Sequence, residues 1–194
     1  MAGRTPNDAV NAFVQPIQAA LTCFAMGPVR VSGWKDGAEG TLNFCGAEGV
    51  ALNGAARLHL SVAMKFRVRD RPRTLTDRRR WKVSTTGWIY VLKHRDGRSI
   101  GEFHWHPAIT PEVQFPHVHV PSPILGKHFP TGRVLIEDIL GFAVECGAEP
   151  YDPVKWEGIR SANVKNFELG ATWGARHRPW PWARSQVADE SAET

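Results

Sequence analysis

Histidine is the residue type in this sequence whose number and spacing most clearly suggest chemistry. Six of the eight histidines lie between positions 94 and 128. Four of them form two pairs separated by one residue, His104 with His106 and His117 with His119. Because alternate side chains of a β-strand point to the same face, each pair would present both imidazoles on one side of a strand. If the two strands pair with these faces aligned, the four imidazoles converge, and we expect them to form the catalytic site.

Two kinds of chemistry are open to four convergent imidazoles. Three of them, with Glu102 or Glu112 as a further ligand, could bind a divalent metal that activates water. Without a metal, a neutral imidazole could act as base and a protonated one as acid, as cleavage of a phosphodiester through the ribose 2′-hydroxyl requires. The spacing does not choose between these two, so the cofactor stays unknown. Histidines of this kind also serve as hydrogen-bonded structural residues.

Positive charge is concentrated just before the histidine pairs. The chain has a net charge of +5, yet positions 65–82 alone hold nine basic and two acidic residues. Such a cluster is expected where a protein binds a partner rich in phosphate or carboxylate, and RNA is the partner that we expect. A solvated hairpin tip is the alternative interpretation. The residues expected to hold phosphates are Arg78, Arg79, Arg80 and Lys82.

Antiparallel strands are the elements that would position these side chains. Apolar residues at every second position indicate half-buried strands, and the pair Asp96-Gly97 is typical of a tight hairpin turn. The long strands are predicted at residues 57–69, 81–93 and 99–106, and a short one at 115–120. Shorter strands are expected within residues 27–56. Together these segments predict an antiparallel meander.

The N-terminal region is expected to be helical, which makes the fold class α+β. Apolar residues recur at helical spacing over residues 10–24, and Pro16 should either kink this helix or mark the first turn of a shorter one. The predicted architecture is an antiparallel β-meander with an N-terminal helix and two C-terminal helices. We expect residues 1–162 to form a single domain and residues 163–194 to be a mobile tail.

The two C-terminal helices are predicted from their end signals. Thr131 or the adjacent glycine can open the first, and Gly147 occupies the position just past its end, where glycine is favoured. Asp152 is the expected N-cap of the second helix, which should be short and end near Ile159.

Several classes of protein lose support from what the sequence lacks. No stretch reaches the roughly 18 apolar residues of a membrane span, and the N-terminus does not have the layout of a signal peptide, so we expect a cytoplasmic protein with no membrane partner. The three cysteines are far apart and form no CxxC pair. There is no GxGxxG, no phosphate-binding loop, no GxSxG and no HExxH motif.

One segment supports a resemblance to a known family. Residues 111–119 read PEVQFPHVH and follow Trp88-Ile-Tyr, Arg95-Asp-Gly-Arg and His104-Trp-His-Pro. Over about residues 80–140 this layout resembles the TumE family, the proposed toxin side of a bacterial toxin-antitoxin pair. The family tends to carry adjacent histidines where this chain has His117-Val-His.

The resemblance implies a toxin-like small bacterial protein that acts on RNA in the manner of a ribonuclease, and whose protein partner would be a cognate antitoxin. The rival hypothesis is a non-catalytic protein that binds nucleic acid or a protein partner, with structural histidines. Binding by such a protein would weaken steeply with salt and would survive replacement of the histidines.

Overall fold

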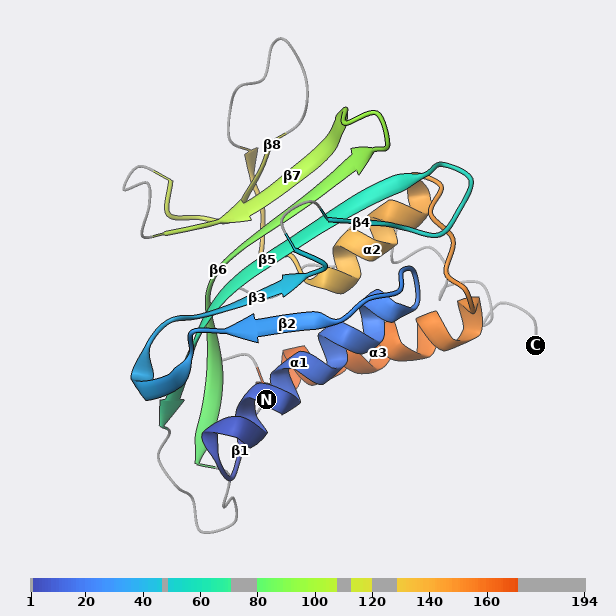
Figure 1. Cartoon of the computed structure of the whole chain (residues 1–194). Helices are drawn as coiled ribbons and strands as arrows, with labels where there is room; N and C mark the ends of the chain where they lie inside the picture. The colour runs from blue at the N-terminus through green and yellow to red at the C-terminus, as the bar shows by residue number, and fades with distance from the viewer. Residues whose placement is uncertain (1, 47–48, 71–79, 108–112, 120–128, 171–194) are drawn as a thin grey trace, which may run out of the picture.

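The computed structural model describes residues 2–46, 49–70, 80–107, 113–119 and 129–170 (Figure 1). The expected fold class is confirmed, with an N-terminal helix, a large antiparallel sheet and two C-terminal helices. Figure 1 shows the three helices gathered on one side of the sheet. Within the described ranges, no helix is long and apolar enough to cross a membrane.

The sheet follows the predicted meander, with some short additional strands. Its order is β2-β3-β5-β6-β7-β8-β9, with β1 paired to β6 and β4 paired to β5. The strands are β1 (Ala2–Gly3), β2 (Val29–Ser32), β3 (Gly40–Phe44), β4 (Val50–Ala51), β5 (Leu58–Asp70), β6 (Trp81–His94), β7 (Ser99–Trp105), β8 (His117–His119) and β9 (Phe129–Pro130). A single 3₁₀ turn, Lys35–Gly37, precedes β3. The predicted turn at Asp96-Gly97 is confirmed, since Gly97 has a φ of 85° and joins β6 to β7.

The alternation along β5 separates two faces of the sheet. Its buried residues are Leu58, Leu60, Val62, Met64 and Phe66. Phe66 packs against Phe13 of the N-terminal helix with ring centroids 5.4 Å apart, and Phe103 of β7 packs against Phe142 at 5.9 Å. The core therefore lies between this face and the helices. We call the opposite face, which carries Lys65 and Arg67, the outer face.

Helix α1 (Pro6–Thr22) begins at a capping box. The backbone amide of Asp8 donates to the Thr5 hydroxyl at 3.1 Å, and the Thr5 amide donates to the Asp8 carboxylate at 3.0 Å. These two bonds satisfy amides that a helix start leaves without an intrahelical acceptor. The helix continues through Pro16, so the alternative of a shorter helix beginning at Pro16 is wrong.

Helix α2 (Ile136–Glu145) begins later than the sequence suggested. Thr131 does not open it, because its amide donates to the carbonyl of Pro116 at 2.7 Å and so extends the pairing of β8 with β9. The helix begins instead after Leu135, whose amide donates to the Asp138 carboxylate at 2.8 Å. The predicted end is confirmed, since Gly147 has a φ of 95°.

Helix α3 (Pro153–Gly170) begins as predicted but does not end near Ile159. The Asp152 carboxylate accepts from the Lys155 amide at 3.0 Å, as an N-cap does. The helix then passes through the boundary expected at residue 162. The apolar periodicity fades there because Asn163 docks this half by polar contacts, donating to the Pro16 carbonyl at 2.9 Å and to the Glu137 carboxylate at 2.7 Å. The rest of the expected tail, residues 171–194, lies outside the described residues.

Replacement of Asn163 by alanine tests this docking. Glu137 is only 5% exposed, so loss of its amide donor should lower the free energy of unfolding by about 1–3 kcal/mol. Urea unfolding measures the effect. Asn166→Ala is the matched control, since Asn166 is exposed on the same helix and its loss should change stability by about 0.5 kcal/mol or less. Equal effects of the two substitutions would show that α3 is not held by Asn163.

Candidate functional site

The histidine cluster, defined as His104, His106, His117 and His119, is built where β7 and β8 pair. In that register His104 lies opposite His117, and Glu102 lies opposite His119. Phe103, between Glu102 and His104, packs against α2, so its neighbours point to the outer face. The two histidine pairs therefore face the same side of the sheet, which is the condition that their convergence required.

The four imidazoles lie close together in space. Ring centroids are 4.7 Å apart for His104 and His119, and 5.0 Å apart for His117 and His119. His106 lies 5.3 Å from His117 and 5.7 Å from His104. His106 follows the last residue of β7, and this contact brings it into the cluster.

Three of these residues could share one metal ion. One ring nitrogen from each of His104, His106 and His117 lies within 4.8 Å of the other two. At this upper limit, a point equidistant from the three nitrogens lies about 2.8 Å from each, and zinc–nitrogen bonds measure about 2.0–2.1 Å. A small inward adjustment of the nitrogens would bring them to bonding distance.

His117 is oriented in the way that metal-binding histidines usually are. Its Nδ1 lies 3.0 Å from the carbonyl oxygen of Phe115. A carbonyl can only accept, so Nδ1 carries the proton and the lone pair is on Nε2. Histidine ligands commonly fix their tautomer through such a bond to a backbone carbonyl. The side chain is fully buried, which also fixes the ring.

A carboxylate stands beside the cluster. Glu102 Oε2 lies 3.7 Å from His104 Nε2, and about a third of the Glu102 side chain is exposed. The Nε2 atoms of His104, His117 and His119 are themselves shielded from solvent. Glu102 is thus placed to act as a further ligand or as a proton acceptor. Glu112, the other carboxylate suggested by the sequence, lies outside the described residues.

Of the basic residues expected to hold phosphates, Arg80 and Lys82 lie within the described ranges, and neither is brought beside the histidines. Lys82 lies seven residues from Ile89, the β6 neighbour of His104, a separation of about 23 Å along the strand. Arg80 makes a bidentate ion pair with Asp70 at 2.6–2.9 Å and lies over the Trp81 ring. Arg78 and Arg79 lie outside the described residues.

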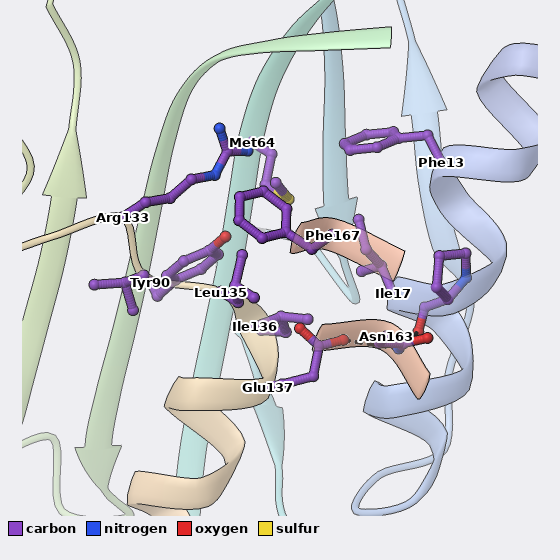
Figure 2. Close-up of a pocket in the computed structure, with 12 residues that line it drawn as sticks. Phe13, Ile17, Met64, Tyr90, Arg133, Leu135, Ile136, Glu137, Asn163 and Phe167 are labelled. Atoms are coloured by element: carbon purple, nitrogen blue, oxygen red, sulfur yellow. Dashed lines mark hydrogen bonds between the residues drawn. The ribbon is translucent and has the colours of Figure 1, made fainter. Parts of the chain in front are cut away.

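A second group of polar residues, on the helical side of the sheet, was not foreseen from the sequence. A cavity of about 70 Å³ lies between β6 and the three helices. Figure 2 shows Arg133 and Tyr90 toward one end and Glu137 with Asn163 toward the other, while Phe167 reaches across from α3. No spacing in the sequence marks these residues, since they come from a loop, a strand and two helices.

The contacts of this group explain its presence in the core. Arg133 donates to the Thr85 hydroxyl at 3.2 Å, and its guanidinium lies 4.7 Å from the centre of the Phe167 ring. Burial lowers the pKa of Arg133. Burial also raises the pKa of Tyr90, with smaller contributions from Glu137 and Asp138 in the same direction and from Arg133 against it. We interpret the group as polar contacts that tie α3 to the sheet.

Comparisons with protein-family models, with curated proteins and with solved structures gave no match. The function of this chain is therefore inferred from its own residues and their geometry.

The raised pKa of Tyr90 predicts a loss of stability in alkali. The folded state keeps the phenol protonated, whereas the unfolded chain releases this proton above a pKa of about 10. The stabilisation is complete below that pH and falls as pH rises through it. In a Tyr151→Phe protein, where Tyr90 is the remaining tyrosine, tyrosinate absorbance should appear only as the chain unfolds. Ionisation of Tyr90 near pH 10 in the folded protein would contradict the expectation.

Proposed function

We propose that this chain is a metal-dependent phosphodiesterase that cleaves RNA, and that His104, His106 and His117 bind its divalent ion. The observation that carries the proposal is the convergence of three imidazole nitrogens within 4.8 Å. Nitrogen ligands of this kind suit zinc and the related transition metals rather than magnesium or calcium. Three protein ligands leave a coordination position for water, as in catalytic zinc sites. We therefore favour the metal-dependent chemistry over acid–base catalysis by histidine alone.

An ion held by these three residues would polarise a phosphoryl oxygen and lower the pKa of bound water to about 7. Glu102, 3.7 Å from His104, is placed to accept the proton that this water loses. The water oxygen then forms a bond to phosphorus while the bond to the departing ribose oxygen breaks. The departing oxygen takes up a proton from solvent, and Glu102 releases its proton to solvent, so that the carboxylate is restored. His119 lies opposite Glu102 and beside His104 on the same face, so it can assist proton transfer to and from Glu102.

Several features support RNA as the substrate. Nine basic residues between positions 65 and 82 would attract a polyanion, and the sequence pI is about 9.4. The resemblance of residues 80–140 to the TumE family agrees with a toxin-like protein that acts on RNA in the bacterial cytoplasm. A cognate antitoxin that covers the histidine cluster is the protein partner that this proposal implies.

Metal analysis of the purified protein tests the proposed ligands. We expect one equivalent of zinc or a related ion, and His104→Ala or His106→Ala should weaken binding by about tenfold or more. Cleavage of single-stranded RNA should stop on chelation and return when the ion is restored. His59→Ala is the matched control, since His59 is also half-buried on a strand but belongs to β5. Full activity in metal-free protein would contradict the proposed dependence on a metal ion and favour catalysis by histidine alone.

Glu102→Gln separates catalysis from metal binding. The amide keeps the shape of the side chain but cannot take a proton, so RNA cleavage should fall by about 10²-fold or more while the metal stays bound. Expression of the wild-type chain should inhibit growth, and both Glu102→Gln and the double variant His117→Ala with His119→Ala should abolish the inhibition. Circular dichroism establishes that each variant is folded. A folded Glu102→Gln protein that cleaves RNA and inhibits growth as the wild type does would refute this role.

A further inference from the structure

The outer face of the sheet has a hollow that begins at the histidine cluster. Its volume is about 140 Å³, and His106 forms part of its wall. The hollow continues across β6 and β5 to β3, where Thr41 and Asn43 line it. It therefore joins the proposed metal site to strands that are distant from the histidines in sequence.

The strand register explains the direction of this hollow. One straight row of facing residues crosses the sheet and consists of Asn43, Ala63, Ile89, His104 and His117. Neighbouring strands lie about 4.8 Å apart, so Ala63 is about 10 Å from His104 and Asn43 about 14 Å. A group bound over Ala63 would therefore lie two strands from His104, and the wall formed by His106 connects its site with the cluster.

Small residues keep the hollow open. Ala63 presents only a methyl group, and Gly87, in the next row, presents no side chain. A Cβ at Gly87 would lie 2.9 Å from the backbone oxygen of Trp105, so a larger residue there would push β6 from β7. The floor is thus apolar and flat beside Ile89, while the hydroxyl of Thr41 and the amide of Asn43 offer hydrogen bonds at the far wall.

A row of cations leads away from the hollow along the outer face. Lys65, Arg67 and Arg69 occupy alternate positions of β5, spaced by about 6.6 Å, and Lys82 of β6 lies opposite Arg69. Glu39 contacts the first two, at 3.5 Å from Lys65 and 4.0 Å from Arg67. The side chains of Lys65 and Arg67 are nevertheless each 52% exposed, so both can still approach a phosphate. We call Lys65, Arg67, Arg69 and Lys82 the cation row.

A hydrogen bond and a nearby lysine stabilise the ionised form of Glu39. The Thr86 hydroxyl donates to Glu39 at 2.7 Å, and this bond, with a smaller contribution from Lys65, holds the pKa of Glu39 below its ordinary value. Glu39 is therefore an anion at neutral pH and orients Lys65 and Arg67 at the rim of the hollow. The cations outnumber it, so the rim and the cation row keep a net positive charge.

We propose that the hollow holds one unstacked base of single-stranded RNA, next to the phosphate that is cleaved, and that the cation row holds the phosphates of the strand beyond it. The inference rests on the proposed function and deepens it by naming the form of the substrate and the residues that bind it. A flat apolar floor with hydrogen-bonding groups at one wall suits a splayed base read at its edge. A cation at every second residue suits a flexible backbone, and duplex RNA would not enter a hollow of this size.

Ala63→Leu tests the hollow, because the larger side chain fills its floor without touching the histidines. Ser61→Leu is the matched control, since Ser61 lies on the same strand and face but outside the hollow. Three quantities are measured on the full chain: bound metal, hydrolysis of bis(p-nitrophenyl) phosphate, and binding and cleavage of a short fluorescent single-stranded RNA. Ala63→Leu should keep the first two and weaken RNA binding by about tenfold or more, whereas Ser61→Leu should change none of them.

The outcomes separate the hollow from the proposed function. If the Ala63→Leu and Ser61→Leu proteins bind and cleave RNA equally well, the hollow does not bind a base, and the proposed metal site is unaffected. A wild-type chain without metal and without activity on either substrate would overturn the proposed function. The role of the hollow would then be tested by comparing RNA binding by the Ala63→Leu and Ser61→Leu proteins. A wild-type chain that does not bind the RNA would overturn both.

The cation row is tested by salt dependence. Each phosphate contact on a single strand contributes about 0.7 to the slope of log affinity against log salt concentration. Lys65→Gln should lower that slope by about 0.7, whereas Lys93→Gln, at an exposed lysine near the other end of β6, should leave it unchanged. Equal slopes in these two variants would exclude Lys65 from the binding surface.

Discussion

The register between β7 and β8 is the constraint on which the candidate site depends. The side-chain period of a strand is two, so a slip by one residue would turn His117 and His119 toward the helices. Contacts on both sides hold this register. Phe103 packs against α2 on the helical side, the Trp105 indole donates to the Gln114 carbonyl at 3.1 Å, and Thr131 continues the pairing beyond β9. Four imidazoles are therefore gathered by core packing rather than by their own attraction.

A β-bulge on β6 directs one polar side chain to each face of the sheet. Between Lys65 and Phe66 the register with β6 shifts, which leaves Thr86 as an extra residue. Thr85 then accepts a hydrogen bond from Arg133 on the helical side, while Thr86 donates to Glu39 on the outer face. Bulges let successive side chains be aimed separately in this way. The polar rim of the outer hollow and the anchoring of α3 thus begin at adjacent residues.

Rigid support is what the proposed chemistry requires of such a fold. His104 and His117 lie on paired strands, where ligands are held more closely than on loops, and the buried ring of His117 has little freedom to turn. The buried polar group around Tyr90 and Arg133 connects the helical side of the same sheet to α3. Its cost is the desolvation of Arg133 and Glu137, which hydrogen bonds to Thr85 and Asn163 offset.

The sequence by itself determined the elements and the faces of this protein. Alternation of apolar residues predicted the long strands, end signals at Asp152 and Gly147 predicted helix boundaries, and the spacing of the histidine pairs predicted that each pair shares a face. Only the tertiary structure decided that the two pairs meet, that α3 continues past Ile159 to dock through Asn163, and that small residues leave a hollow beside His106. Periodicity and end signals are properties of neighbouring residues, whereas register, docking and cavities depend on contacts between residues far apart in the chain.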